Sequence, residues 1–535
     1  MAQQTTPTML HTDVLVVGAG PVGMALALDL RYRGIRFLIL DASDGTVVHP
    51  KVGTVGPRSM ELFRRWGVAG RIRDAGWPAD HPLDIAWVTA VGGHEIHRIP
   101  FGTAGTRPPL PYTPEPEQVC PQHWLSPLLA REVGVDPEGP LRRECRVDGF
   151  RQDPEGVTAW ATDLRTRKRL TVRARYLVAC DGASSSLRKA AGIPAPSRHA
   201  TRVFRNILFR APQLRHQLGA RGALVHFLTQ PPALRFPLRS MDGRELYRLT
   251  VAAGGSTRSR DLDEDALAMV RSAIAFDTPL EIVSENVWYL THRVARRFRS
   301  GRLLLAGDAA HTLSPSGGFG MNTGICDAAD LGWKLAAELA GWAGAGLLDS
   351  YDTERRPVAE RSLEEANANL MRTMARELPK EILLNSEDGA RARSALAEEL
   401  ERGGVRREFE APDVHFGFRY TSDLVVDEGP GDWRTDAVPG GRAPHAWLDE
   451  RRSTLDLFGQ GFRLLSFTDD PVDPLAAAFA DRRVPLETTR CDDEAVAALY
   501  KKPHVVVRPD GHVAWRGTRL PADPGRLVDT VRGAR

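Results

Sequence analysis

Hydrophobic and polar positions near the start of the chain predict a strand, a glycine-rich turn, a helix and a second strand. Val14–Val17 is a short, continuously apolar run, which is typical of a parallel strand covered on both faces. Met24–Arg33 predicts a helix, and Gly34 can end it in the left-handed conformation. Ile35–Leu40 predicts the next buried strand. This order indicates an α/β domain with a parallel sheet.

The pattern changes between about residues 202 and 251, where strand-like segments follow one another without helices. Phe204–Phe209 and Leu246–Val251 are two such segments, and their succession is typical of an antiparallel sheet. Parallel character returns with the apolar run Arg302–Ala306, which a long helix from about Met321 to Leu339 follows. We therefore expect a separate antiparallel sheet that is inserted into the α/β domain.

The last part of the chain divides into a helical stretch, a connector and a small domain. Residues 350–404 are rich in Glu, Arg and Ala, which favours helix, whereas residues 411–440 hold several glycines and prolines. Strand–helix alternation resumes after about residue 441. We predict these boundaries: the α/β domain at 1–75, 107–195 and 291–410, the antiparallel-sheet domain at 76–106 and 196–290, the connector at 411–440, and the C-terminal domain at 441–535.

Composition narrows the class of protein. A chain of 535 residues is long enough for two or three domains, and 42% apolar with 26% charged residues is typical of a globular protein. The net charge is only +3 with acids and bases interspersed, which argues against nucleic-acid or membrane-surface binding. The apolar run Val14–Leu28 is interrupted by glycines, so we interpret it as neither a signal peptide nor a membrane span. Five scattered cysteines without C-x-x-C predict a cytoplasmic protein with no metal site.

A glycine motif lies between the first predicted strand and helix. Gly18-Ala-Gly20-Pro21-Val-Gly23 matches G-x-G-x-x-G, in which the three glycines permit a tight turn, close approach to a pyrophosphate and close helix–strand packing. The following helix start offers free N–H groups to the phosphates. Asp41 ends the second strand, where an acid is expected to bind ribose hydroxyls. The segment therefore predicts a Rossmann-like dinucleotide site.

Two further motifs follow predicted strands. Asp181-Gly182 begins a D-G-x-x-S-x-x-R motif, which Ser185 and Arg188 complete. Gly307-Asp308 is followed by a glycine-rich segment that leads into the long predicted helix. With the three motifs in this order, the chain resembles the aromatic hydroxylase family of flavoprotein monooxygenases, the group of para-hydroxybenzoate hydroxylase and its phenol and polyketide relatives.

The resemblance implies FAD as the cofactor and NADH or NADPH as a transient reductant. Asp308 is implied to hold the ribityl chain, and Asp181, with Arg188 as its partner, to support the FAD and NAD(P)H regions. The start of the long helix is implied to face the flavin pyrimidine edge, where its dipole would stabilise negative charge. The cofactor-binding residues expected from the motifs and the resemblance are Gly18, Gly20, Pro21, Gly23, Asp41, Arg58, Gln122, Asp181, Arg188, Asp308, Pro315, Gly318, Gly320, Met321 and Asn322.

The resemblance also shows where this chain departs from its relatives. Many relatives carry Glu at the position of Asp41, and the shorter side chain predicts looser FAD binding. Lys51 occupies a position where relatives often have Arg, and an ammonium group cannot reproduce a bidentate guanidinium contact. No protein side chain is expected to act as a catalytic residue, because the family's protein part orients the reactants and excludes water. His311 is assigned no role.

Arginines on the predicted antiparallel sheet indicate the charge of the substrate. Arg235, Arg239, Arg244 and Arg248 lie within 14 residues on otherwise apolar strands. Alternating arginines usually face solvent, and we expect this of Arg235 or Arg244. An arginine that faces the apolar interior would instead bind a carboxylate bidentately.

Stretches outside the motifs resemble a narrower group, the RebC- and StaC-like flavoproteins of indolocarbazole biosynthesis. These stretches are residues 52–68, 205–212 and 312–324. The resemblance implies a cytochrome P450 partner and a bis-indole carboxylate substrate derived from chromopyrrolic acid. It implies that Arg239 and Arg248 hold the substrate carboxylate and that Val225 lies beside them. Because Val225 and Arg248 favour different members of the group, the product stays open between a K252c-type lactam and an arcyriaflavin type.

Two alternatives stay open at this point. One is a phenolic or polyketide hydroxylase of the same fold, and the other is a flavin-binding protein that shields a labile intermediate. The tail resembles the thioredoxin-like C-terminal domain of the phenol-hydroxylase branch, and without C-x-x-C we expect a structural or dimer-contact role. The choice of NADH or NADPH, and of monomer or homodimer, is left open.

Overall fold

The fold is taken from a computed structural model that describes residues 8–51, 53–134, 139–230, 233–253, 265–374 and 377–534. Its central element is an eight-stranded sheet, in which a parallel core carries antiparallel strands at its margins. The order is β17-β18-β10-β1-β2-β7, with β9 and β8 beside β10. Its strands are β1 (Thr8–Val17), β2 (Phe37–Leu40), β7 (Leu141–Arg142), β8 (Cys145–Asp153), β9 (Gly156–Asp163), β10 (Arg169–Ala179), β17 (Arg299–Ser300) and β18 (Leu303–Leu305).

The buried core explains why the first strand and helix form where the sequence predicts them. Val14, Leu15 and Val16 are fully buried, as expected of a strand between two parallel neighbours. The strand begins earlier than predicted, at Thr8, because its first residues pair with β10 outside the covered core. Helices α1 (Pro21–Tyr32), α4 (Gln122–Val133), α9 (Phe319–Ala340) and α10 (Ser350–Met374) belong to the same unit. Among the described residues no helix is long and apolar enough to cross a membrane.

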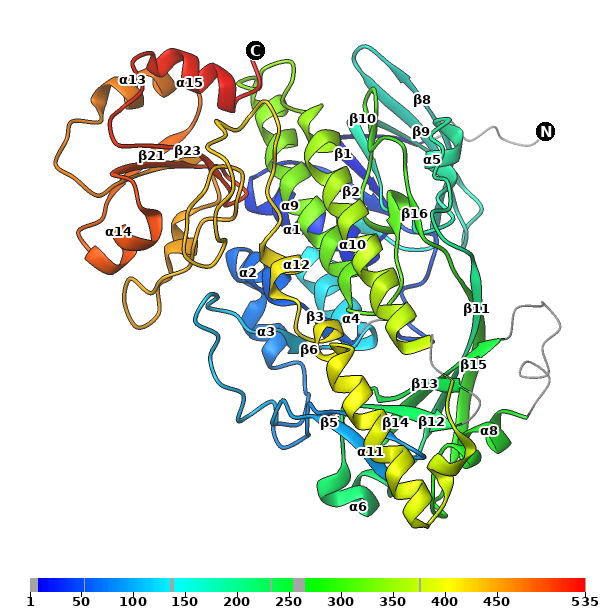
Figure 1. The fold of residues 1–535 in the computed structure, drawn as a ribbon. Helices are drawn as coiled ribbons and strands as arrows, with labels where there is room; N and C mark the ends of the chain where they lie inside the picture. The colour runs from blue at the N-terminus through cyan, green and yellow to red at the C-terminus, as the bar shows by residue number, and fades with distance from the viewer. Residues whose placement is uncertain are drawn as a thin grey trace, which may run out of the picture.

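A second sheet of seven strands lies beside this unit, which confirms the predicted antiparallel insertion (Figure 1). Its order is β15-β11-β14-β13-β12-β4-β5, and all neighbours are antiparallel except β12 and β4. Its strands are β4 (Ile85–Val88), β5 (Glu95–Ile99), β11 (Arg202–Arg210), β12 (Val225–Gln230), β13 (Ala233–Ser240), β14 (Leu246–Ala253) and β15 (Glu281–Leu290).

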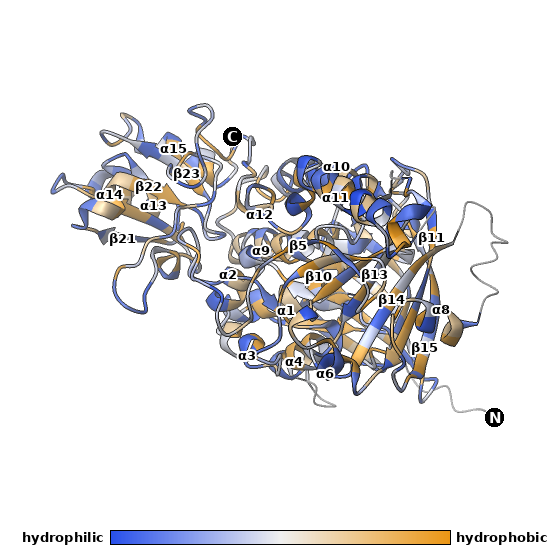
Figure 2. Ribbon diagram, turned by 60° about the horizontal axis from the view of Figure 1, so that its bottom comes forward, coloured by the Kyte–Doolittle hydropathy of each residue, from blue (hydrophilic) through white to orange (hydrophobic). Residues whose placement is uncertain are grey.

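The two faces of the second sheet have different coverings. One face packs its apolar residues, such as Ile207 and Leu249, against the short helices α6 (Leu214–Leu218) and α8 (Ala266–Ser272). The other face packs residues such as Ile85 and Phe227 against α11 (Glu387–Arg402). Figure 1 shows α11 lying along this sheet, and Figure 2 shows hydrophilic residues on α10 and α11. The face that carries Ile85 and Phe227 is therefore covered by segments that come late in the chain.

The C-terminal unit contains a four-stranded sheet in the order β21-β20-β22-β23. A parallel strand–helix–strand pair is followed by an antiparallel hairpin and a last helix, which is the predicted thioredoxin-like arrangement. Its core joins Trp333 and Ala337 of α9 to Phe462, so the unit is packed against α9. Its elements are β20 (Phe462–Ser466), α13 (Asp473–Asp481), β21 (Leu486–Arg490), α14 (Glu494–Tyr500), β22 (His504–Val507), β23 (Val513–Gly517) and α15 (Pro524–Val531).

Candidate cofactor and substrate site

The glycine loop between β1 and α1 leaves one open backbone surface. A Cβ on Gly18 would collide with the carbonyl oxygen of Cys180, and one on Gly23 would collide with the carbonyl of Gly18, so the fold itself requires both glycines. A Cβ on Gly20 would meet no protein atom within 4 Å. Pro21 is the first residue of α1, whose N-terminus has no side-chain cap. The open Gly20 backbone and the uncapped N–H groups together form a cradle suited to a phosphate.

Asp41 follows β2 directly beside this loop. One carboxylate oxygen accepts a hydrogen bond from the backbone N–H of Ala19, and the other accepts one from the N–H of Ser43 at 2.7 Å. The nearest guanidinium nitrogen of Arg143 lies 3.7 Å from that second oxygen. The structure therefore places the acid against the glycine loop, as the sequence predicts for a ribose-binding carboxylate.

The Asp181 motif lies at the carboxyl end of β10. One oxygen of Asp181 accepts from the N–H of Leu187 at 3.2 Å, whereas the other, Oδ1, is buried and has no partner among the residues that the structure describes. The expected pairing with Arg188 does not form, because the Arg188 guanidinium donates to the carbonyl of Ile193 at 3.1 Å. Burial and the nearby charge of Arg293 lower the pKa of Arg188.

Asp308 and the start of α9 face the same region. Asp308 follows β18 and is exposed, and no described residue forms a hydrogen bond or ion pair with its carboxylate. Gly318, at φ 66°, caps α9 without any side-chain hydrogen bond, and its N–H donates to the carbonyl of Pro315 at 2.9 Å. A Cβ on Gly320 would meet nothing within 4 Å. Met321 packs against the main core. The first turn of α9 is thus open at its backbone.

Three other predicted cofactor residues hold the protein together with their side chains. The Asn322 side chain accepts from Gly56 N–H and Ser59 Oγ, at 2.8 and 2.7 Å. Gln122 accepts from the N–H of Lys51 at 3.0 Å. The buried guanidinium of Arg58 is turned towards the C-terminal unit, and its expected contact with the cofactor stays a prediction. This guanidinium donates to Glu61 at 2.8 Å and to the carbonyl of Asp510 at 3.0 Å. Val52, the first residue of the stretch 52–68, lies outside the described residues.

These observations test whether the site suits FAD. The groups left open are the Gly20 backbone, the N-termini of α1 and α9, the orphaned oxygen of Asp181 and the carboxylate of Asp308. Phosphates suit the first helix start, and sugar or ribityl hydroxyls suit the acids. The donor set therefore fits FAD.

Three predicted substrate residues lie in one row across the second sheet. Val225 of β12 is the register partner of Arg239 of β13, and Arg239 is the register partner of Arg248 of β14. Directly opposed residues in a sheet point to the same face, so the three side chains are neighbours. On β4 the row continues with Ile85, and on β11 it continues with Leu208.

Neither arginine of this row has an acidic partner among the described residues. Arg239 donates to Thr54 Oγ1 at 3.0 Å, and Arg248 donates to the carbonyl of Pro50 at 2.6 Å. Each keeps a buried Nε atom that has no partner within the described ranges. Burial lowers the pKa of both guanidinium groups to about 10, and for Arg239 the charge of Arg248 adds to the effect. Two adjacent, desolvated cations without an anion form a site for an anionic ligand.

The segment that covers the arginines also contacts the start of α9. A Cβ on Gly53 would meet the Arg239 guanidinium at 2.5 Å, so this glycine makes room for the arginine. The hydroxyl of Thr54 accepts a hydrogen bond from Arg239, and the carbonyl of Thr54 accepts one from the Asn322 side chain at 3.4 Å. One residue therefore connects the arginine row with the helix expected to face the flavin. Arg244 is exposed, as expected, and the Arg235 side chain lies outside the described residues.

An acid that sequence reasoning missed, the half-buried Glu408, lies on the same side. Burial raises the pKa of Glu408 to about 7, against hydrogen bonds from Ser316 and Thr373 that act to lower it. The next residue, Phe409, contacts Trp87 and Phe227, whose rings stack 5.1 Å apart. Glu408 lies in a charged stretch whose pattern is typical of an ordinary surface helix, so no sequence signal distinguishes it.

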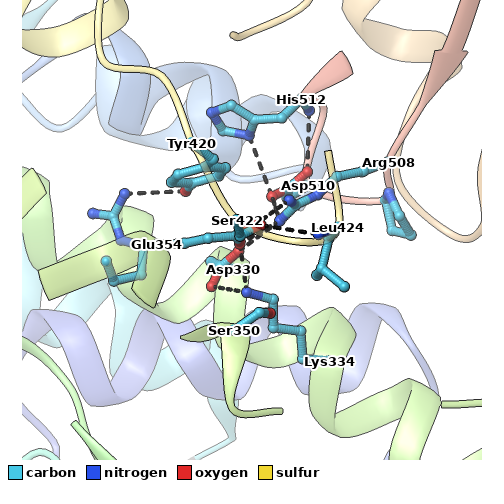
Figure 3. A network of polar contacts seen from close by, with 12 residues as sticks. Asp330, Lys334, Ser350, Glu354, Tyr420, Ser422, Leu424, Arg508, Asp510 and His512 are labelled. Atoms are coloured by element: carbon cyan, nitrogen blue, oxygen red, sulfur yellow. Dashed lines mark hydrogen bonds and ion pairs between the residues drawn. The ribbon is translucent and has the colours of Figure 1, made fainter. Parts of the chain in front are cut away.

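A buried ionic network joins the C-terminal unit to α9 and α10 (Figure 3). Arg508 donates to Glu354 at 2.6 Å, to Asp330 at 3.0 Å and to Asp510 at 2.8 Å, and Lys334 binds the first two acids. Burial raises the pKa of Asp330 to about 7. Burial also acts to raise the pKa of Glu354, but Arg508 and Lys334 outweigh it and lower the value to about 2.

This network continues to the Gly307–Asp308 turn. Asp327 accepts from the N–H of Gly307 at 3.2 Å, from His311 at 2.7 Å and from Arg355 at 2.8 Å. Arg355 in turn donates to the hydroxyl of Tyr420 at 3.1 Å. His311 is fully buried in this contact and thus belongs to the support of the turn.

Comparison with known proteins agrees with this geometry. A family model described as FAD binding domain matches residues 11–366, and one described as aromatic-ring hydroxylase, C-terminal, matches residues 436–533. A structure of chromopyrrolic acid-soaked RebC with bound 7-carboxy-K252c has 61% identity and a TM-score of 0.95, covering 99% of this chain and 100% of that one. Tetracenomycin B2 monooxygenase-dioxygenase of Streptomyces olivaceus is 32% identical over 98% of each chain. Aklavinone 12-hydroxylase DnrF of Streptomyces peucetius is 33% identical over 86% of this chain and 92% of that one.

Proposed function

The chain belongs to the FAD-binding aromatic-ring hydroxylases and is an FAD-dependent monooxygenase, and from this premise we propose that it acts in indolocarbazole biosynthesis. Its proposed substrate is a carboxylated bis-indole intermediate derived from chromopyrrolic acid, which a cytochrome P450 partner supplies. The proposed product is the indolocarbazole aglycone, of the K252c or the arcyriaflavin type. NADH or NADPH serves as the reductant.

The paired guanidinium groups of Arg239 and Arg248 carry this proposal. They lie opposite each other on one sheet face, are surrounded by protein and have no acid near them in the described chain. A substrate carboxylate would accept charge-assisted hydrogen bonds from both groups and supply the missing anion. A neutral aromatic ring would leave both cations uncompensated.

The comparisons support the same ligand class. The RebC structure that matches 99% of this chain at 61% identity contains bound 7-carboxy-K252c. A further RebC structure with the same identity has reduced flavin. These ligands belong to RebC, and their transfer to this chain is part of the proposal.

FAD, when bound, would supply the redox chemistry that the protein side chains lack. The open backbone at Gly20 and the carboxylates of Asp41, Asp181 and Asp308 would hold it. Arg239 and Arg248 orient the substrate by its carboxylate. Phe227 and its stacked neighbour Trp87 provide an apolar wall that keeps water from the reacting ring.

Glu408 is proposed to carry a proton at neutral pH. Its raised pKa, about 7, keeps a large part of the carboxyl groups protonated near neutrality. A protonated carboxyl can donate a hydrogen bond to a carbonyl or hydroxyl oxygen of the substrate. This role would make Glu408 a proton donor beside the segment that leads into α9.

Product analysis tests the function. The FAD-loaded protein is mixed with the intermediate that a chromopyrrolic-acid-oxidising P450 releases, NADPH is added, and the products are identified by mass spectrometry. We expect one aglycone to dominate, compared with a mixture when the flavoprotein is omitted. An identical product profile with and without the protein would refute the substrate assignment.

A polyketide hydroxylase is the second candidate, and the tetracenomycin and aklavinone relatives favour it. The two candidates differ at the arginine row, because an uncharged polyketide gives the arginines no counter-charge. Substrate-stimulated NAD(P)H oxidation distinguishes them. Stimulation by a neutral anthracycline or tetracene aglycone, but not by a bis-indole carboxylate, would favour the polyketide candidate.

A further inference from the structure

A second polar row lies next to the arginine row on the same sheet. Asn206 of β11 is the register partner of both Asn286 of β15 and Thr250 of β14. Thr250 follows Arg248 by two positions on β14, and Asn206 precedes Leu208 by two positions on β11. Asn286 lies on the same face because it is the register partner of Asn206. Because side chains alternate between the faces of a sheet, both rows point to the same face.

The groups of the second row are incompletely paired. Thr250 donates to Oδ1 of Asn206 at 2.9 Å, which leaves the NH₂ group of Asn206 without an acceptor in the described part of the chain. Asn286 Oδ1 and the indole Nε1 of Trp288 are buried, and neither has a partner there. With the Nε atoms of Arg239 and Arg248, four buried polar atoms on one sheet face lack a partner among the residues that the structure describes. Unpaired buried polar atoms are rare in native proteins, and a cluster of them marks a ligand site.

Other segments of the chain enclose this face of the sheet at both ends of the row. Phe204 and Leu290 pack against Leu370 of α10 at one end of the row. At the other end, the Ser284 hydroxyl lies 3.5 Å from Nδ1 of His49, in the segment that also covers Arg248. The opposite face of β15 is open to solvent, where Val287 is 48% exposed. The polar row therefore lies between the cover of the arginines and the helix α10.

Sheet geometry sets the reach between the two rows. Two residues along a strand span about 6.8 Å, and neighbouring strands are about 4.8 Å apart. A flat polycyclic ligand whose carboxylate contacts the arginines can therefore place a second polar group on the asparagine row. Asn206 offers a donor there, and Asn286 offers an acceptor. A donor beside an acceptor complements the C=O and N–H of a cyclic amide.

We propose that Asn206, Asn286 and Trp288 form a second subsite that binds a neutral amide, a lactam or imide, of the same aromatic ligand whose carboxylate the arginines bind. The proposal rests on the proposed function and refines it. The arginines recognise the acid that is present before the last oxidative steps, and the asparagine row recognises the amide ring. A ligand with both groups would contact both rows at once.

Two probe ligands separate the two rows. K252c is a lactam without a carboxylate, and chromopyrrolic acid is a dicarboxylate without an amide. Their dissociation constants are measured with the full-length, FAD-loaded protein from the change in flavin absorbance. We expect Asn286→Leu to weaken K252c binding by about tenfold, the effect of losing one buried hydrogen bond, and to change chromopyrrolic acid binding by less than about twofold. Arg248→Asn should have the opposite pattern.

Further variants guard against a folding artefact. Thr250→Val keeps the side-chain shape but releases the Asn206 amide, and should weaken K252c binding by about threefold. Val287→Thr, on the exposed face of the same strand, should change neither affinity. FAD content and melting temperature are recorded for each variant, so that a misfolded protein is recognised.

The outcomes distinguish the subsite from the function on which it rests. Unchanged K252c binding in both Asn286→Leu and Thr250→Val would overturn the subsite, and so would an equal loss for both ligands. If the wild type binds K252c through Asn286 but does not bind chromopyrrolic acid, the subsite stands and the proposed carboxylate substrate fails. If the wild type binds neither ligand, both proposals are overturned.

Discussion

Arg239 and Arg248 stand directly opposite each other on β13 and β14, and protein oxygens hold both guanidinium groups, with no carboxylate partner in the described part of the chain. Thr54 and the carbonyl of Pro50 fix their positions before any ligand arrives. Preorganised cations cost little to orient when a ligand binds, so this pair should favour an anionic ligand group.

Removing one of these arginines should weaken carboxylate binding selectively. For Arg248→Asn we expect about 10- to 100-fold weaker binding of chromopyrrolic acid, the range for loss of a charge-assisted hydrogen bond. Arg244→Asn is the matched control, because Arg244 is exposed on the same hairpin. Titration of flavin absorbance measures both constants. Equal, small effects of the two substitutions would contradict the assignment of Arg248.

Val225 should influence the product through its size. It is the register partner of Arg239, so a larger side chain there would narrow the space beside the arginines. We expect Val225→Phe to shift the ratio of K252c-type to arcyriaflavin-type product without lowering FAD content. Liquid chromatography with mass spectrometry gives the ratio. An unchanged ratio in both Val225→Phe and Arg248→Asn would remove these residues from the substrate site.

Asp308 should contribute to FAD binding and little to folding. Its carboxylate is exposed and unpaired in the described chain, so Asp308→Ala removes no protein contact. We expect about tenfold weaker FAD binding, because a buried ligand hydroxyl loses a charged acceptor. Asp74→Ala, at another exposed acid, serves as the control. Wild-type affinity in Asp308→Ala, measured by fluorescence titration of the apoprotein, would refute the role.

Glu408 should make stability depend on pH. Its folded pKa, about 7, lies above the unfolded value of about 4.3, so the folded protein binds the proton more tightly. The contribution of Glu408 protonation to the free energy of unfolding is complete below the unfolded pKa and is lost as pH rises towards 7. Between pH 5 and 8, the melting temperature of Glu408→Gln should therefore rise relative to that of the wild type as the pH increases. The exposed Glu410→Gln should follow the wild type, and parallel curves for all three proteins would contradict the prediction.

Arg508 should be a major contributor to the attachment of the C-terminal unit. Arg508→Met leaves the buried carboxylates of Asp330, Glu354 and Asp510 short of positive charge, and removal of one partner from a buried ionic network costs about 3–5 kcal/mol. Arg482→Ala breaks a part-exposed pair with Asp529 and should cost less than about 1 kcal/mol. Urea denaturation compares the two variants, and similar losses would argue against a special role of Arg508.

The sequence predicted the parts of the site that depend on local backbone constraints. Gly18 and Gly23 collide with nearby carbonyl oxygens when given a Cβ, so the strand–turn–helix geometry fixes their identity within one short segment. Asp181 and Asp308 follow strands whose apolar runs are visible in the sequence. The family, the cofactor and the fold class are confirmed by the comparisons. The individual cofactor and substrate roles, and the domain boundaries, stay predictions.

Other features could not be predicted because they depend on side-chain directions set by distant parts of the chain. Arg58 was expected near the flavin, but the carbonyl that binds it comes from Asp510, 452 residues away. Arg188 lies near Asp181 in sequence but donates to Ile193 instead. Glu408 gains its raised pKa only because the fold buries it beside Ser316 and Thr373.

The sequence by itself thus determined the α/β framework, the FAD site and the inserted sheet, because strand periodicity and glycine sterics act over a few residues. Only the tertiary structure decided which arginines share a face of the sheet and which acidic side chains are shielded from solvent. A register shift of one residue would turn Arg248 to the opposite face of its sheet. The hairpin of β13 and β14 sets the register of Arg239 and Arg248, whereas the pairings of β12 with β4 and of β11 with β15 join strands far apart in the chain. Together these pairings decide which side chains share one face of the sheet.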